Sequence, residues 1–304
     1  MFEQSALTQA TTDSESVTPP RGFSEPVLPA QPLVVIEAKT SLSALDLRDV
    51  WAYRELLYFL TWRDLKVRYK QTLLGVVWVV LQPLMLTVIF TVFLSMLVRV
   101  PSDGLPYPVF VYAGLLPWTF FSGAVSGGGN SLVTNAHLVT KVYFPRLIVP
   151  TASVAGRLVD FAIAFGILAG LLAYYRVVPT WNMLALLPLV ALTTLLALGC
   201  ATLLSALNVK YRDIGIVLPV FMQFWMYVSP VIYPSRLVYE RLGRWGWLYS
   251  LNPLVGILDG FRAALFGSAF NRFALGVSVA SALGLFFLSI LVFRRVEGSF
   301  ADLI

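Results

Sequence analysis

Charged residues are scarce in this sequence. Only 12% of its 304 residues are Asp, Glu, Lys or Arg, and 58% are hydrophobic. A soluble domain usually carries about 25% charged residues, so this composition excludes an ordinary soluble protein. Several apolar runs exceed the roughly 18 residues that indicate a membrane-spanning helix. The sequence therefore predicts an all-α, polytopic membrane protein.

Histidine and cysteine occur once each, as His137 and Cys200. A single histidine excludes a histidine-rich metal site and an acid–base pair of histidines, and a single cysteine excludes an internal disulfide bond. The only carboxylate within the predicted spans is Asp160, and Arg157 precedes it by three residues on the same helical face. Because a charge in the bilayer is costly, we expect these two residues to pair or to face protein or water. No catalytic residue and no metal ligand can be assigned.

A phosphate-binding loop is also missing. The pattern G-x-x-x-x-G-K-S/T does not occur, so this chain is not expected to bind ATP by such a loop. The run Gly127-Gly128-Gly129 has no lysine after it, and it indicates close helix approach or a bend. The sequence shows no internal repeat, which weakens the case for a secondary transporter built from inverted halves.

Residues 54–70 form the clearest amphipathic stretch. Five residues can share its apolar face, namely Leu56, Leu57, Leu60, Leu65 and Tyr69, while Arg54, Arg63, Lys66, Arg68 and Lys70 carry the charge. This pattern is typical of a helix in the membrane interface, and we assign it to residues 46–72. The alternative is a basic flank that only fixes topology. Residues 1–45 are rich in Ser, Thr and Pro and predict a disordered cytoplasmic tail.

Six spans are predicted within a membrane domain at 73–293. They lie near 73–98, 107–132, 147–175, 183–207, 214–233 and 273–293, and residues 294–304 form a C-terminal tail. Outside the spans, fourteen Lys and Arg residues fall on one side and seven on the other. The richer side marks the cytoplasm and places both termini there. The stretch 234–272 is too interrupted by Pro and Gly to span. It favours a re-entrant element of two short helices in the outer leaflet, or else an amphipathic extracellular loop.

Several sequence blocks resemble one known family. They are KVRYKQTLLGVVWVVLQPL (66–84), GLLPWTFF (114–121), NSLVTNAHLVTKVYFPR (130–146), NVKYRD (208–213), SPVIYP (229–234) and LNPL (251–254). In this order they resemble the permease subunit of the ATP-binding-cassette exporters of bacterial surface polysaccharides, which move O-antigen, capsule and teichoic-acid polymers. The resemblance covers about residues 50–304. It implies a bacterial inner-membrane permease that moves a lipid-linked, O-antigen-like polysaccharide.

The resemblance also implies partners. We expect a homodimer of this chain with two copies of a separate ATPase, which carries ATP and magnesium, and no cofactor in this chain. Membrane lipids and a lipid-linked polysaccharide are the remaining partners, and no nucleic acid is expected. The net charge of +6 comes from basic residues beside the spans, where anionic headgroups account for them.

The loop 133–146 is expected to carry the coupling helix of the family, with the amphipathic helix as a second ATPase-facing element. A helix in this loop would end at Pro145. The coupling residues would be His137, Leu138, Lys141, Tyr143 and Phe144 in this loop, Arg63, Arg68 and Tyr69 in the amphipathic helix, and Arg212 and Asp213, as a supporting ion pair, in the next cytoplasmic loop. The alternative for 133–146 is a plain connector.

Aromatic stripes on two spans suggest a smooth path for a sugar polymer. Aromatic faces stack on sugar rings without fixing a hydrogen-bond register. The path residues would be Trp78, Gln82 and Phe93 on the first span and Phe221, Phe224, Trp225 and Tyr227 on the fifth. The alternative is lipid-facing belt residues. Similarly, Arg157 and Asp160 are either a local ion pair or a polar point on the path or at a subunit seam.

Three other functions stay open. One is an exporter of teichoic acid, drugs or small lipids on a related permease fold. Another is a membrane-bound glycosyl- or acyltransferase, which would need acid–base side chains gathered in a sizeable aqueous loop. The last is a passive channel or scaffold, and only a dependence on ATPase binding would distinguish an exporter from it.

Overall fold

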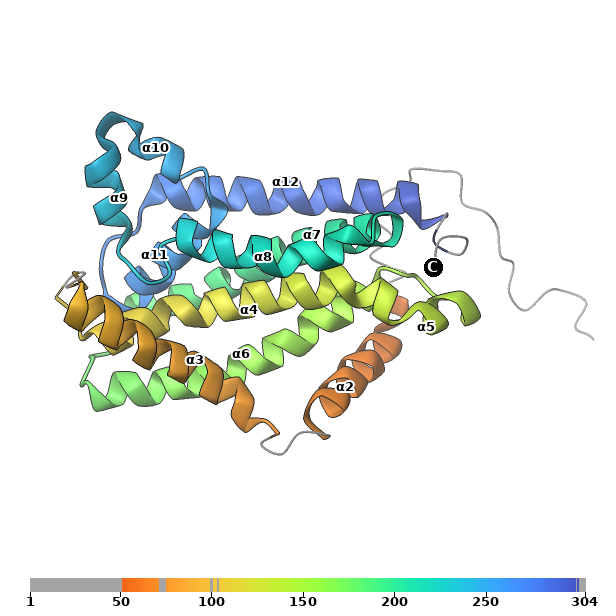
Figure 1. The fold of residues 1–304 in the computed structure, drawn as a ribbon, viewed down its shortest axis with the longest axis horizontal. Coiled ribbons are helices and arrows are strands. Elements are labelled where there is room, and N and C mark those ends of the chain that lie inside the picture. Colours follow the sequence, from red (N-terminus) through yellow and green to blue (C-terminus); the bar gives the residue numbers. More distant parts are fainter. Residues whose placement is uncertain (1–50, 71–74, 99–100, 103, 299, 301–304) are drawn as a thin grey trace, which may run out of the picture. The chain divides into compact units, whose positions relative to one another are not determined.

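The described part of the chain is entirely helical. The computed structural model describes residues 51–70, 75–98, 101–102, 104–298 and 300. Within them the elements are α2 (Arg54–Lys70), α3 (Val77–Phe90), the π-helix η1 (Thr91–Leu97), α4 (Tyr107–Thr134), α5 (Ala136–Lys141), α6 (Ile148–Tyr174), the 3₁₀ helix η2 (Trp181–Ala185), α7 (Leu186–Lys210), α8 (Asp213–Val228), α9 (Ser235–Leu242), the 3₁₀ helix η3 (Gly243–Trp245), α10 (Gly246–Tyr249), α11 (Pro253–Phe266) and α12 (Arg272–Glu297) (Figure 1). This confirms the all-α prediction. The predicted tail at 1–45 lies outside the described residues.

Within the described residues, five helical segments are long and apolar enough to cross a membrane. They are Val77–Met96, Tyr107–Thr134, Ile148–Tyr174, Trp181–Lys210 and Arg272–Glu297. They match five of the six predicted spans. The sixth prediction, 214–233, falls on α8, which has 16 residues. Its helix stops at Val228 because Ser229 is extended and Pro230 follows. A 16-residue helix is about 24 Å long, shorter than the roughly 30 Å hydrocarbon core, so this sixth span stays a prediction.

Helix α4 is the centre of the bundle. Its side chains Phe110, Tyr112 and Phe121 are fully buried among α6, α7, α8 and α11. The Tyr112 hydroxyl donates to the carbonyl of Ala164 on α6 at 3.0 Å. A methyl group built on Gly128 would lie 2.5 Å from the Ala201 Cβ of α7. The triple glycine therefore permits close helix approach, as the sequence indicates.

Residues 234–272 form a small helical group beyond the end of α8. Helices α9 and α10 are largely exposed, whereas α11 is buried against α4, α7 and α12. The buried Arg262 of α11 donates to the carbonyls of Pro230 and Val231 at 2.7 Å each and lies 3.9 Å from the Phe110 ring centre. It thus satisfies the backbone that the SPVIYP turn leaves unpaired. A re-entrant position in the membrane stays a prediction.

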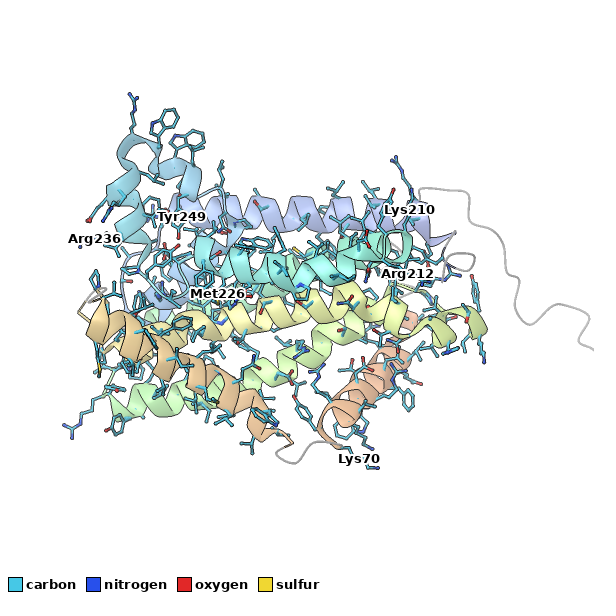
Figure 2. The ribbon with its side chains drawn as sticks, viewed as in Figure 1. Lys70, Lys210, Arg212, Met226, Arg236 and Tyr249 are labelled. Carbon is cyan, nitrogen blue, oxygen red and sulfur yellow. The ribbon has the colours of Figure 1, made fainter. Side chains whose placement is uncertain are left out.

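The opposite end of the bundle is held by a second apolar cluster. It joins Leu60 of α2, Val139 of α5, Val209 of α7 and Phe293 of α12. We call this region the α5 end. Lys210 and Arg212 lie at it, and Arg236 and Tyr249 lie at the other end (Figure 2). Helix α2 lies obliquely beside the first half of α6 (Figure 1), and its last turn lies next to Asp160 near the middle of that helix.

Candidate functional site

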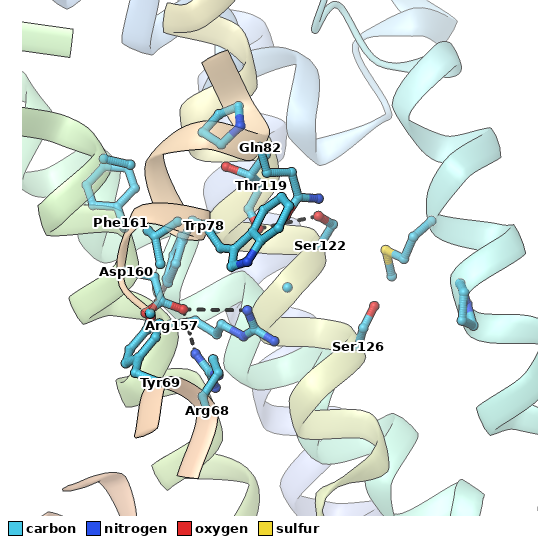
Figure 3. Close-up of a pocket in the computed structure, with 18 residues that line it drawn as sticks. Arg68, Tyr69, Trp78, Gln82, Thr119, Ser122, Ser126, Arg157, Asp160 and Phe161 are labelled. Carbon is cyan, nitrogen blue, oxygen red and sulfur yellow. Dashed lines mark hydrogen bonds and ion pairs between the residues drawn. The ribbon is translucent and has the colours of Figure 1, made fainter. Parts of the chain in front are cut away.

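A cavity of about 620 Å³ opens where the last turn of α2 meets the spans. Its lining comes from α2, α3, α4, α6 and α8 (Figure 3). The charged lining residues are Arg68, Arg157 and Asp160. The neutral polar ones are Tyr69, Gln82, Thr119, Ser122 and Ser126, and Trp78, Phe120, Phe161 and Met222 are among the apolar ones. A cavity of this size, mostly apolar with a few convergent polar groups, is typical of a ligand site.

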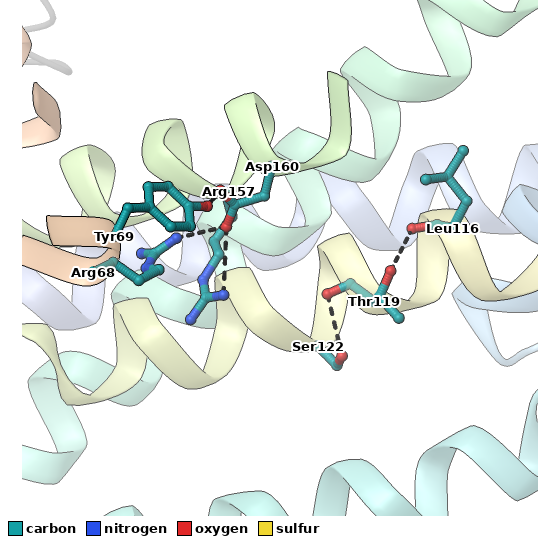
Figure 4. Close-up of polar contacts among 7 residues, drawn as sticks. All are labelled: Arg68, Tyr69, Leu116, Thr119, Ser122, Arg157 and Asp160. Atoms are coloured by element: carbon teal, nitrogen blue, oxygen red, sulfur yellow. Dashed lines mark hydrogen bonds and ion pairs between the residues drawn. The ribbon is translucent and has the colours of Figure 1, made fainter. Parts of the chain in front are cut away.

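Asp160 is the hub of the charged residues. Its carboxylate accepts from Arg68 Nη1 at 2.5 Å and from the hydroxyl of Tyr69, both on α2, and from Arg157 Nη1 at 3.5 Å (Figure 4). The sequence predicts the Arg157–Asp160 pair, and the structure confirms it as the longer of two ion pairs. Burial, followed by the hydrogen bond to Asp160, raises the pKa of Tyr69 to about 12, so this hydroxyl remains a donor at neutral pH.

The cluster carries an excess of positive charge. Two guanidinium groups and one carboxylate leave one net positive charge on the cavity wall. Among the described residues, the buried Nε of Arg157 has no hydrogen-bond partner. An unsatisfied buried donor costs about 1–3 kcal/mol. The charged part of the cavity wall is therefore cationic, and its hydrogen-bond donors are incompletely satisfied by the described residues.

The Arg157 side chain packs against two glycines of α4. Methyl groups built on Gly123 and Gly127 of α4 would lie 3.5 Å and 3.8 Å from the Arg157 Nε. These glycines are four residues apart on one helical face, so they leave room for the guanidinium between α4 and α6. The sequence analysis singles out Gly127 as part of the glycine run but misses Gly123, although the small-xxx-small spacing of the two is a known signal of close packing.

A short polar stripe on α4 faces the same cavity. The hydroxyl of Thr119 donates to the carbonyl of Leu116, and that of Ser122 donates to the carbonyl of Thr119. With its proton used this way, each hydroxyl presents acceptor lone pairs to the cavity or to a second donor. The sequence reading missed this stripe as well. The signal in the sequence was the spacing of Thr119, Ser122 and Ser126, which are three and four residues apart and so share one helical face within an apolar span.

The predicted path residues fall into two groups. Trp78 and Gln82 line the cavity. Phe93, Phe221, Phe224 and Tyr227 do not, and their side chains are exposed on η1 and α8. Trp225 turns inward instead, because its indole donates to Asn252 Oδ1 at 3.1 Å and its ring meets Phe121 edge-on. Trp225 is half-buried between helices, and its ring also lies 5.3 Å from the Phe221 ring, so these two residues share one face of α8 as predicted. A path role for any of these residues stays a prediction.

The loop 133–146 contains the predicted short helix, α5, but the helix ends early. Lys141 is its last residue and Val142 is extended, so Pro145 is not the residue that stops it. His137, Lys141 and Tyr143 are exposed, and Tyr143 is 76% accessible. Leu138 is partly buried, and Phe144 is buried in the cluster of the α5 end. The loop thus presents an exposed basic and aromatic surface, and the buried Phe144 side chain fixes the loop to the apolar cluster of the α5 end.

Helix α2 and this loop are in direct contact. Arg63 Nη2 donates to Asn135 Oδ1 at 2.6 Å, just before α5, and also bonds Asp64 at 2.8 Å. Leu60 packs in the same cluster as Val139 and Phe144. Arg63 and Arg68, both predicted to face an ATPase, therefore hold internal partners. The structure joins the exposed loop to the charged cavity through a single helix.

Arg212 and Asp213 are both exposed at the α5 end. Within the described residues these two side chains form no ion pair with each other, which corrects the predicted Arg–Asp support. Asp213 is the first residue of α8, where its negative charge favours the helix N-terminus. The loop is held instead by Asn208, which donates to the carbonyl of Gly129 and accepts from the amide of Gly215.

Comparison with known proteins identifies the family. The family model described as "ABC-2 type transporter" matches residues 55–266. The chain belongs to the ABC-2 type transporter family. The match runs from α2 to the end of α11, so it includes the cavity, α5 and the α2–α5 contact.

Relatives of this ABC-2 chain are similar over most of their length. The chain is 31% identical over 221 residues to the O-antigen export system permease protein RfbA of Myxococcus xanthus, covering 72% of this chain and 83% of that protein. It is 26% identical over 251 residues to a Klebsiella pneumoniae protein of the same name, covering 82% and 95%. It is 24% identical over 237 residues to the polysialic acid transport protein KpsM of Escherichia coli, covering 73% and 88%.

Membership in the ABC-2 family makes this chain a transporter membrane subunit rather than an enzyme, and it implies a separate ATP-binding partner. The chain is therefore a polytopic membrane permease.

Proposed function

We propose that this chain is the permease subunit of an ATP-driven exporter of a lipid-linked surface polysaccharide in a bacterial inner membrane. The observation that carries the proposal is the similarity, over 72–82% of the chain, to proteins named for O-antigen export. The similarity to a polysialic acid transport protein supports the same substrate class. Polysaccharide therefore ranks ahead of a teichoic acid, a drug or a small lipid as cargo.

We further propose that the chain works as a homodimer with two copies of the ATPase. Exposed apolar side chains support this pairing, because α3 and η1 expose Met85, Ile89 and Phe93, and α8 exposes Phe221 and Phe224. These faces need lipid or a second copy of the chain to cover them. A two-fold pair brings the same face of both copies together, which is the economical way to enclose a polymer.

The α5 end is proposed to be cytoplasmic, with both termini on that side. Lys141, Lys210 and Arg212 belong to this end, and the predicted cytoplasmic side holds fourteen of the Lys and Arg residues outside the spans against seven. An excess of Lys and Arg marks the cytoplasmic side of a membrane protein. This orientation presents the exposed loop to a cytoplasmic ATPase.

The route of coupling then follows from the contacts. Movement of the ATPase would push the exposed surface of α5. The Arg63–Asn135 bond and the Leu60 cluster would pass the movement to α2, and Arg68 and Tyr69 would pass it to Asp160 on α6. This chain of contacts ends at the wall of the cavity.

Deletion of this chain tests the proposal. A strain without it should synthesise the surface polysaccharide but retain it inside, and the plasmid-borne chain should restore the polymer to the surface. Normal surface polymer in the deletion strain would contradict the proposal. Loss of polymer synthesis itself, with restoration of a sugar-transfer activity by the purified chain, would favour the glycosyltransferase alternative instead.

A further inference from the structure

We infer that Arg68 and Arg157 form a binding site for a phosphate group carried by an amphiphile of the bilayer. The inference rests on the proposed function, because it names the part of a lipid-linked substrate that this cavity takes. The same chemistry has two possible sources, namely the phosphate end of the carrier lipid and the headgroup of a resident anionic phospholipid. The site is the 620 Å³ cavity between α2, α3, α4, α6 and α8 (Figure 3).

The donors for a phosphate are present and partly unused. Each guanidinium has five N–H donors in a planar fork that suits phosphate oxygens. The structure gives Arg68 one bond to Asp160 at 2.5 Å and gives Arg157 one long bond to it at 3.5 Å. The buried Nε of Arg157 has no partner within the described part of the chain. A phosphate oxygen beside Arg157 would supply one.

The charge balance favours an anion. The two arginines and Asp160 leave one net positive charge in a cavity lined by five helices, where the Arg68 and Arg157 side chains are 27% and 34% accessible. An uncompensated charge at membrane depth is costly, and an anionic ligand would neutralise it. A neutral sugar would leave the excess charge in place. The α4 hydroxyls of Thr119 and Ser122 line the same cavity and can accept weaker hydrogen bonds from the ligand.

The position favours a ligand held in the membrane. Asp160 lies 12 residues after the first residue of α6, which is about three helical turns into the span. The wall of the cavity continues into apolar surface, since Trp78 lines it and the neighbouring Val76 and Val77 are exposed. An acyl or prenyl chain can lie along such a surface while its phosphate enters the cavity. A free phosphate would have to leave water to reach the same depth.

Asp160 forms ion pairs with both arginines when no anion is bound. A carboxylate and a phosphate would compete for the same guanidinium groups, so removing the negative charge of Asp160 should strengthen phosphate binding. Removing the positive charge of Arg157 should weaken it. A merely structural ion pair makes a different prediction, because loss of either partner would then disturb the site in the same direction.

The experiment measures lipid binding to the complex of this permease with its ATPase in nanodiscs of zwitterionic lipid. The probes are polyprenyl diphosphate and phosphatidylglycerol, titrated separately by native mass spectrometry. The variants are Arg157→Gln, Arg157→Lys and Asp160→Asn. The matched control is Arg236→Gln, since Arg236 is exposed on α9 and does not line the cavity.

The expected result is a loss of affinity of about tenfold or more for Arg157→Gln, since a hydrogen bond to a charged group is removed. Arg157→Lys should bind more weakly than the wild type and more tightly than Arg157→Gln, Asp160→Asn should bind more tightly than the wild type, and Arg236→Gln should match it. Preference for polyprenyl diphosphate would assign the site to the carrier lipid, and preference for phosphatidylglycerol would assign it to a resident phospholipid.

Unchanged binding in Arg157→Gln, or weakened binding in Asp160→Asn, would overturn the inference. So would a wild-type complex that binds neither probe. Each of these results leaves the proposed function standing, because that function is decided by surface polymer in the deletion strain. Conversely, a chain that binds the probes as expected but does not restore surface polymer would contradict the proposed function and not the site.

Discussion

At the residue scale, the partner of Asp160 shows how far sequence reasoning extends. A lone carboxylate in an apolar span requires a cation, and Arg157 at the i−3 position was the visible candidate. The shorter ion pair comes from Arg68, which is 92 residues away in sequence. Nothing in the local pattern encodes that separation, because it depends on how α2 lies against α6.

Gly128 gives a prediction at this scale. Gly128→Ala should destabilise the chain by about 1–3 kcal/mol, because the added methyl group would lie 2.5 Å from the Ala201 Cβ and force α4 from α7. Thermal unfolding of the purified chain in detergent measures this. The matched control is Gly170→Ala on α6, where the added methyl group meets no atom within 4 Å. The control should be neutral or slightly stabilising, since alanine favours the helix over glycine. Equal unfolding temperatures for the two variants would contradict the close contact.

At the element scale, the sequence predicted well the helices whose pattern is local. The predicted interface helix at 46–72 contains α2, which spans Arg54–Lys70, and its place in the membrane interface stays a prediction. The glycine run predicted the close approach of α4. The sequence could not show that Arg63 would bond Asn135, nor that Trp225 would turn toward Asn252, because both contacts join separate elements. The polar wall of the cavity was missed for the same reason, since Thr119 and Ser122 matter only beside Arg157.

The exposed surface of α5 gives the prediction for an element. Lys141→Glu combined with Tyr143→Ala should lower polysaccharide export by about tenfold or more, because both side chains are exposed where an ATPase would dock and charge reversal across an interface costs several kcal/mol. Surface polymer and co-purification of the ATPase are measured together. Since neither side chain is buried, membrane insertion should be unchanged.

The control for this double variant is Tyr174→Ala, at an exposed position on the last residue of α6. It should export normally. Normal export by the double variant would make the loop a plain connector. Lost export with normal ATPase binding would show that α5 transmits the movement beyond the docking contact.

At the scale of the whole molecule, membership in the ABC-2 family implies that this chain depends on a separate ATP-binding partner for energy, in agreement with the absence of a phosphate-binding loop from its sequence. The ABC-2 match accounts for the spans, and the fold supplies a continuous set of contacts from an exposed loop to an internal cavity. The length of the apolar run at 214–233 predicted a sixth span. The helix in that run, α8, has only 16 residues, because it ends at a Ser-Pro break.

Energy dependence gives one prediction for the molecule. The purified permease should release no phosphate from ATP, because the sequence has no G-x-x-x-x-G-K-S/T loop. Adding the purified ATPase should produce turnover. Robust hydrolysis by the permease alone, free of any ATPase on a gel, would be incompatible with this account.

Topology gives a second prediction for the molecule. In a Cys200→Ser background, Trp181→Cys should react with an impermeant thiol reagent added outside cells with a permeable outer barrier, and Lys141→Cys should not. Trp181 lies in η2 between α6 and α7, and Lys141 ends α5, so the two residues mark opposite ends of the bundle. The Lys and Arg asymmetry places the α5 end inside. Labelling of Lys141→Cys alone would invert the orientation.

The most direct measurement is transport in reconstituted vesicles. The purified permease and its ATPase are placed in vesicles together with labelled lipid-linked polysaccharide, and movement of the polymer across the bilayer is followed by its protection from an added glycosidase. We predict that protection changes only when both chains and hydrolysable ATP are present. It should be lost with a hydrolysis-deficient ATPase. Movement without ATP would indicate a passive channel, and no movement with both chains active would contradict polysaccharide export by this permease.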